Sequence, residues 1–154
     1  MKKLNNHLNT FGTIIQTLNE LNSNSTRIGG SMLFELYGLK FHRVPDDIDI
    51  IITNPNKDQE LFLKTLRLFR SHEKGDYIYY GGDNFKIKKN GCILNILVVR
   101  EYKQNILPIF YQHNNYNYPL VTINEILDAK RKYKRTKDIY DFEKLKNLNF
   151  NING

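Results

Sequence analysis

The stretch DDIDIII at residues 46–52 is apolar and β-branched after its first aspartates, and it is bounded by Pro45 and Pro55. Such a run between turn residues predicts a β-strand. Side chains two positions apart on a strand point to the same face, so Asp47 and Asp49 are expected to stand side by side. Two neighbouring carboxylates repel each other unless a cation lies between them. The pair therefore predicts a divalent metal site, with Mg²⁺ or Mn²⁺ as the ion.

A glycine-rich turn precedes this strand by about the length of a short helix. Gly29 and Gly30 follow a strand expected over residues 26–28, and Ser31 opens a helix expected over residues 32–39. Glycine lets the backbone approach a phosphate group closely, and a helix start offers N–H donors to it. Alone, a Gly-Gly-Ser turn is usually a loop, and an Asp-x-Asp pair is usually a solvated strand end. In this order and spacing, the two motifs together predict nucleotide chemistry.

The composition is typical of one globular domain. The 154 residues include 40% hydrophobic residues, ten tyrosines and nine phenylalanines, which is enough for a core. The single cysteine, Cys92, excludes a disulfide framework and a cysteine-based zinc site. No apolar run has the length that spans a bilayer, and no apolar block follows the basic N-terminus. A cytoplasmic protein is therefore expected.

Positive charge is unevenly distributed along the chain. The net charge is +7, and the densest run of lysine and arginine covers residues 129–137. Such a run is either a solvated helix face or a contact for a polyanion, and the polyanion would be a triphosphate or RNA. Both interpretations stay open at this point.

Hydrophobic periodicity and turn residues predict an α+β fold, a mixed sheet flanked by helices with a C-terminal helical segment. Helices are expected over residues 4–21, 32–39, 58–69, 123 onward and 138–148, and strands over residues 26–28, 46–52, 77–80, 85–89, 92–99 and 119–121. Thr122 and Glu125 form a capping-box pattern at one helix start. Residues 114–118 are expected to form a polar, aromatic loop, and residues 102–110 are ambiguous.

We expect a single domain over residues 1–154, with no internal repeat and no linker that would divide it. Its N-terminal helix would occupy residues 1–25, and the core sheet and helices would occupy residues 26–121. The C-terminal helices would occupy residues 122–150.

These motifs resemble those of the nucleotidyltransferase superfamily, which has the DNA polymerase β-like fold. Its hallmark is a Gly-Ser turn, a helix and then a strand bearing Asp-x-Asp, and Gly30-Ser31 and Asp47-Ile48-Asp49 match it. Arg43, four residues before Asp47, also fits the form seen in small bacterial members. A closer resemblance is to the minimal nucleotidyltransferases of the abortive-infection toxin type, the AbiEii-like group.

A second motif of that group is a lysine followed by Lys-Asp and a later Asp, and it is matched by Lys130, Lys137-Asp138 and Asp141. The resemblance implies a nucleotide-binding site formed by Gly29, Gly30, Ser31, Arg43 and Asp138. It also implies metal ligation by Asp47 and Asp49, with charge on the transferred phosphoryl group neutralised by Lys130 and Lys137. The implied reaction transfers a nucleoside monophosphate from an NTP to a hydroxyl of RNA, a protein or a small molecule. Such chemistry depends mainly on positioning and charge compensation.

One position departs from the superfamily pattern. Members usually carry a third carboxylate on a later strand, and the matching run, residues 92–99, has Asn95 there. An amide brings no negative charge to a metal and is no base at neutral pH. Asp83 is an alternative third carboxylate if the strands pair in another register.

Two further functions stay open because of this departure. The chain would be a catalytically inactive protein of the same fold, acting as a structural or interaction module with a protein partner or in a larger, even viral, assembly. Otherwise it would bind a nucleotide without turning it over. Transfer of label from an NTP separates the enzyme from both of these, and nucleotide binding without transfer identifies the last.

Overall fold

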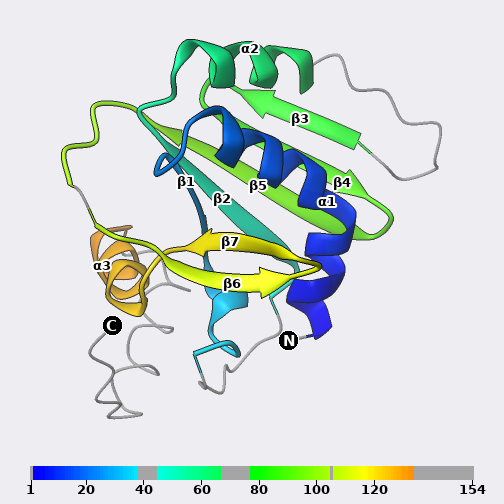
Figure 1. Cartoon of the computed structure of the whole chain (residues 1–154), viewed down its shortest axis with the longest axis vertical. Coiled ribbons are helices and arrows are strands. Elements are labelled where there is room, and N and C mark those ends of the chain that lie inside the picture. The colour runs from blue at the N-terminus through cyan, green and yellow to red at the C-terminus, as the bar shows by residue number, and fades with distance from the viewer. Residues whose placement is uncertain (1, 38–44, 67–76, 105, 134–154) are drawn as a thin grey trace.

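A computed structural model of the chain describes residues 2–37, 45–66, 77–104 and 106–133 (Figure 1). Three α-helices, one 3₁₀ helix and seven strands follow one another along these residues. In chain order they are α1 (Lys2–Leu21), β1 (Thr26–Gly29), the 3₁₀ helix η1 (Ser31–Leu33), β2 (Asp47–Thr53), α2 (Lys57–Leu66), β3 (Tyr77–Gly81), β4 (Asn84–Lys89), β5 (Cys92–Val99), β6 (Ile109–His113), β7 (Tyr116–Leu120) and α3 (Ile123–Tyr133). The α+β fold expected from the sequence is confirmed.

The strands form one mixed sheet in the order β3-β4-β5-β2-β1-β7-β6. β2 pairs parallel with β5 and antiparallel with β1, and β1 pairs parallel with β7. The two edges are antiparallel hairpins, β3–β4 and β6–β7. β2 therefore lies in the middle of the sheet, with β5 on one side and β1 on the other.

One face of this sheet is packed against α1, which contacts β1, β2 and β5 (Figure 1). On β2, Ile48, Ile50 and Ile52 are fully buried, and they alternate with partly exposed residues. The apolar stripe of α1 meets them with Leu4, Leu8, Phe11, Ile15 and Leu18. An alternating strand against an amphipathic helix buries one face and leaves the other free for polar side chains.

α1 also holds the β6–β7 hairpin through polar side chains. Tyr111 Oη donates to Asn5 Oδ1 over 2.7 Å, and Gln16 Nε2 donates to Tyr118 Oη over 2.8 Å. Asn19 Nδ2 donates to Tyr116 Oη over 2.9 Å. The hydroxyl groups of these tyrosines are thus satisfied on the first helix, while the ring of Tyr118 is buried and those of Tyr111 and Tyr116 are partly buried.

The helix expected over residues 32–39 is wrong in its described part. Ser31–Leu33 form a single 3₁₀ turn, and residues 34–37 form a turn rather than a regular helix. Met32, Leu33 and Phe34 are all buried. Three consecutive buried side chains cannot share one face of an α-helix, so the tertiary packing favours a tighter turn. Residues 38 and 39 lie outside the described residues.

The loop expected over residues 114–118 is also wrong. Asn114 and Asn115 alone form the turn, with φ of 49° and 63°, and the strands β6 and β7 flank them. Two consecutive positive φ values are the requirement of a two-residue hairpin turn, and asparagine tolerates them. The sequence pattern did not predict this hairpin, because proline is rare within strands and the residues around the turn are polar. The proline is Pro119 of β7.

The capping box at the start of α3 is confirmed. Glu125 N–H donates to Thr122 Oγ1 over 3.2 Å, and Thr122 N–H donates to Glu125 Oε1 over 3.0 Å. The end of the helix expected over residues 58–69 and the whole helix expected over residues 138–148 lie outside the described residues. No helix in the part of the chain that the structure describes is long and apolar enough to cross a membrane.

A buried glutamine joins two helices to one strand of the sheet. Gln59, fully buried near the start of α2, donates through Nε2 to Leu18 O over 3.0 Å and to Thr26 Oγ1 over 3.3 Å. Its Oε1 accepts from Asn56 N–H and Ser25 Oγ over 3.1 and 3.3 Å. One side chain therefore fixes the end of α1, the start of β1 and the start of α2.

Replacing Gln59 with alanine is expected to destabilise the protein by about 2–4 kcal/mol, because several buried polar groups lose their partner at once. Chemical denaturation of the wild type and the variant measures the difference. Gln112, an exposed residue of β6, supplies the matched control. Q112A should change stability by less than about 0.5 kcal/mol, and equal losses in Q59A and Q112A would contradict the role given to Gln59.

Candidate functional site

The two aspartates of β2 lie on the face of the sheet opposite α1. Asp47 and Asp49 alternate with the buried Ile48 and Ile50, so both carboxylates point away from the core. The parallel pairing of β2 with β5 sets Asp49 opposite Asn95. Asn95 Nδ2 donates to Asp49 Oδ1 over 3.2 Å and also donates to Asp47 Oδ2. One amide group therefore bridges the two carboxylates.

The glycine turn lies directly beside Asp49. Gly29 is paired with Asp49 across the β1–β2 ladder. Gly30 has a φ of 82°, and a Cβ atom built on it would stand 3.0 Å from Asp49 Cγ. Only glycine accepts both this backbone conformation and this approach. The turn and the aspartates, separate in sequence, thus form one place in the structure.

Ser31 begins the 3₁₀ turn that follows. Its carbonyl oxygen accepts from Phe34 N–H over 3.1 Å, and Gly30 O accepts from Leu33 N–H over 3.3 Å. These hydrogen bonds hold residues 30–34 in a fixed shape next to Asp49. The backbone of the predicted phosphate turn is therefore held by its own hydrogen bonds.

The start of α3 is attached to this turn. Val121 N–H donates to Ile28 O over 2.9 Å, and Tyr37 Oη donates to Val121 O. Burial, with a smaller effect of the nearby Glu125, raises the pKa of Tyr37 to about 12. The hydroxyl therefore stays protonated and remains a donor over the physiological pH range. α3, the helix that includes Lys130, leaves from a fixed point near the aspartates.

Several residues named from the sequence cannot be placed relative to the aspartates. Arg43, Lys137 and Asp138 lie outside the described residues, as does Asp141. Lys130 belongs to α3, and only its position on that helix is described. The roles of these residues in nucleotide binding and phosphoryl transfer stay predictions.

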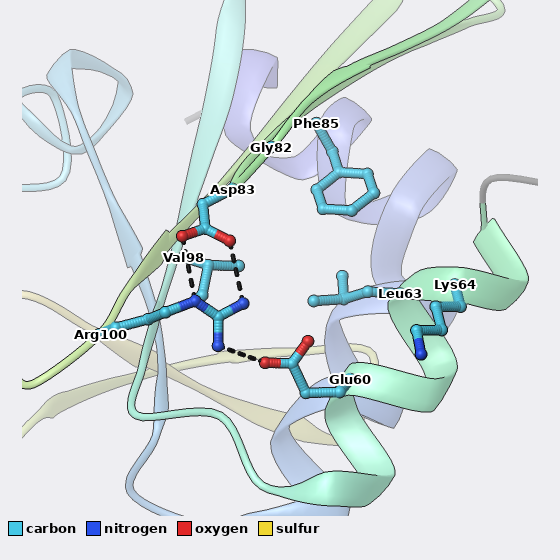
Figure 2. A pocket seen from close by; sticks show the side chains of 8 residues that line it. All are labelled: Glu60, Leu63, Lys64, Gly82, Asp83, Phe85, Val98 and Arg100. Atoms are coloured by element: carbon cyan, nitrogen blue, oxygen red, sulfur yellow. Dashed lines mark hydrogen bonds and ion pairs between the residues drawn. The ribbon is translucent and has the colours of Figure 1, made fainter.

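Asp83 is not a third carboxylate of this site, so that alternative is wrong. It lies in the β3–β4 turn, where its carboxylate receives Arg100 Nε and Nη2 over 3.0 and 2.9 Å. Arg100 also donates to Glu60 of α2 over 2.5 Å. Figure 2 shows these charges beside a small hollow that Leu63 and Phe85 line on the α2 side of the sheet. The hollow and its ion pairs therefore lie on the other face from Asp47 and Asp49.

The donor set at the aspartates fits a hard divalent cation. Asp47 and Asp49 offer carboxylate oxygens, and Asn95 offers an amide oxygen if its side chain turns over. Among the described residues, no group of three or more His, Cys, Asp or Glu side chains could hold a metal. The site thus has two carboxylates and a neutral amide. The N–H donors of the amide lie between the carboxylates and partly offset their mutual repulsion, as a cation would.

Two basic residues on the same face were not identified from the sequence. Lys86 of β4 pairs with Asn95, and Lys88 pairs with Ile93, which in turn pairs with Asp47. The alternation of Lys86 and Lys88 with the buried Phe85 and Ile87 was the available signal. This alternation alone does not place the two lysines near the aspartates, because their proximity depends on the pairing of β4 with β5 and of β5 with β2.

Comparison with solved structures identifies this arrangement as the nucleotidyltransferase fold. The chain superposes on an antigenic nucleotidyltransferase-like protein from Paracoccidioides brasiliensis with a TM-score of 0.55 and 17% identity, covering 92% of this chain and 76% of that one. It superposes on the lincosamide antibiotic adenylyltransferase LnuA, bound to lincomycin, with a TM-score of 0.52 and 18% identity, over 89% and 95% of the chains. It superposes on TM1012 of Thermotoga maritima, a proposed nucleotidyltransferase, with a TM-score of 0.51 and 14% identity, over 90% of this chain and 94% of that one.

These likenesses concern the fold. No protein-family model and no curated protein matches the sequence. The predicted nucleotidyltransferase fold is therefore confirmed by structure, and the resemblance to the AbiEii-like group stays a prediction.

Replacing Gly30 with alanine is expected to destabilise the protein by about 2–4 kcal/mol. The new methyl group would clash with the Asp49 side chain, and alanine would be strained at the positive φ of this position. Gly82 supplies a matched control, since its φ is 63° and a Cβ there would meet nothing within 4 Å. G82A should therefore cost only the backbone strain, about 1 kcal/mol. Denaturant unfolding measures both, and a cost for G30A no larger than that for G82A would refute the close contact.

Proposed function

We propose that the protein transfers a nucleoside monophosphate from an NTP to an acceptor hydroxyl, with Mg²⁺ or Mn²⁺ as cofactor. The observation that carries this proposal is the contact of the Gly30 turn with Asp49, beside Asp47. A phosphate-binding bend and a carboxylate pair on one open sheet face are what nucleotidyl transfer needs. The fold supports the proposal, because LnuA, an adenylyltransferase, shares it.

In this proposal, each part of the site has a separate task. Gly29, Gly30 and Ser31 bind the triphosphate, and the lack of a side chain at the two glycines lets the phosphates approach the backbone closely. Asp47 and Asp49 hold the metal, which when bound would offset the negative charge of the phosphates. Arg43 and Asp138 would contribute to nucleotide binding, and Lys130 and Lys137 would neutralise charge on the transferred phosphoryl group.

The reaction is an in-line displacement at the α-phosphorus. The acceptor oxygen forms a bond to that phosphorus, the bond to the oxygen bridging the β-phosphate breaks, and pyrophosphate leaves. The hydroxyl proton passes to solvent, since Asn95 offers no base at this position. The protein's part is to align the two oxygens and to stabilise the charge on the phosphoryl group.

The acceptor would be RNA, a protein or a small molecule, since each supplies a hydroxyl. A role as a toxin of the AbiEii-like type and a cytoplasmic location belong to the same proposal. So does the single-domain organisation.

Exchange of both aspartates for asparagine tests the site. D47N/D49N keeps the shape of the side chains but removes their charge, so metal-dependent transfer should fall by about 1,000-fold or more. Label from the α-phosphate of NTPs, incubated with Mg²⁺ or Mn²⁺ and total RNA or protein, measures transfer, and calorimetry measures NTP binding. D46N, an exposed neighbour outside the strand, is the control. Wild-type protein that neither binds nor transfers a nucleotide would end the proposal.

A catalytically inactive protein of the same fold is the second candidate, and Asn95 favours it. Its amide stands where the resemblance implies a third carboxylate, and it is bound to both aspartates. Such a protein would act as an interaction module or as a nucleotide binder without turnover.

The substitution N95D separates the two candidates. A carboxylate at this position would add a negative ligand and a base next to Asp47 and Asp49, so metal-dependent transfer should rise by about tenfold or more. The same label assay measures it, with N95A as a control that removes the amide and adds no charge. Transfer that appears only in N95D would identify the natural protein as inactive, and transfer lower in N95D than in the wild type would show that Asn95 itself suits the reaction.

A further inference from the structure

Two lysines extend the candidate site across the sheet, away from the glycine turn. The pairings of β1, β2, β5 and β4 set Gly29, Asp49, Asn95 and Lys86 in one row. Paired residues on neighbouring strands share a face, so Lys86 stands on the face of the aspartates. Strand spacing puts its Cα about 10 Å from that of Asp49.

Lys88 occupies the same position in the adjacent row, with Ile93 and Asp47. Lys86 and Lys88 are two residues apart on β4, so their Cα atoms are separated by about 7 Å along the strand. The opposite face of β4 is buried: Figure 2 shows Phe85 directed toward Leu63 of α2. β4 therefore presents two ammonium groups to the open side of the sheet.

The sheet is accessible to solvent at these strands. Lys86 and Lys88 are partly exposed, and Leu97, which follows Asn95 on the same face, is 40% exposed. Salt bridges between described residues involve neither lysine. The residues of β3 that pair with them are Tyr79 and Tyr77. This face of β4 and β5 therefore combines positive charge with an exposed apolar side chain.

The direction of the proposed reaction assigns this face to the acceptor. In an in-line displacement, the attacking oxygen and the leaving pyrophosphate stand on opposite sides of the α-phosphorus. With the triphosphate at Gly30 on the β1 side of the aspartates, the attacking hydroxyl arrives from the β5 and β4 side. The molecule that carries this hydroxyl then lies over Asn95, Lys86 and Lys88.

We propose that the face of β4 and β5 marked by Lys86, Lys88 and Leu97 binds the end of a single-stranded nucleic acid, whose terminal hydroxyl accepts the nucleotide. This inference rests on the proposed transfer reaction and specifies its acceptor. Two lysines in line along a strand suit successive phosphates of one chain, and the exposed Leu97 adds apolar contact beside them. The net charge of +7 favours the approach of a polyanion and opposes that of a polycationic acceptor.

Neutral substitution of the lysines tests the face directly. Fluorescence anisotropy of a labelled single-stranded RNA oligonucleotide, titrated with protein over a range of salt concentrations, gives the affinity and its salt dependence. K86Q/K88Q should weaken binding by about tenfold at low salt, and the slope of log affinity against log salt should decrease by about 1.4, or about 0.7 for each lost phosphate contact. K57Q/K64Q removes the same charge from exposed positions of α2 and should leave both quantities near the wild type.

The outcomes separate this inference from the proposed function. Equal losses in the two double variants, or no loss in K86Q/K88Q, would overturn the assignment of the face, whatever the fate of the nucleotide. Transfer of label to protein but not to the RNA would also overturn it, although nucleotidyl transfer itself would stand. RNA binding that depends on Lys86 and Lys88, in a protein that binds no NTP, would remove the acceptor role together with the proposed function.

Discussion

The register of β2 between β1 and β5 is the constraint on which the candidate site depends. Three fully buried isoleucines hold it, because a shift by one residue would turn Asp47 and Asp49 into the core and the isoleucines out of it. Burial of an unpaired carboxylate costs several kcal/mol, so such a shift is strongly disfavoured. The hydrophobic pattern of the strand therefore fixes the polar chemistry on its other face. Gly29 and Asn95 reach Asp49 only because of this register.

Asn95 gives this site a different electrostatic balance from one with three carboxylates. Its amide donates to both aspartates, so the repulsion between them is partly relieved without a metal ion. A neutral bridge of this kind stabilises the folded protein when no ligand is present, and it also competes with a cation for the same oxygens. Stability without ligand and affinity for a metal are thus opposed at this residue.

Local patterns predicted much of the fold and the central pair of the site. Apolar, strand-like runs bounded by turn residues predicted β2, β4 and β5, and the expected capping box of Thr122 and Glu125 is formed. These features depend on residues close together in sequence. The 3₁₀ turn after Ser31, the buried Gln59 and the row from Gly29 to Lys86 could not be predicted, since each depends on packing or pairing between distant segments. The Asn114-Asn115 turn carried a local signal, which Pro119 and the surrounding polar residues obscured.

The hydrogen bonds from α1 to the tyrosines of the β6–β7 hairpin have a consequence for how the chain is made. The bonded residues are 97 to 106 positions apart, and the helix precedes the hairpin in the chain. At about 5–20 residues per second, a ribosome needs about 5–20 s to add the missing partners. During that interval Asn5, Gln16 and Asn19 of α1 have no tyrosine partners, so the β6–β7 edge of the sheet is joined to α1 only late in synthesis.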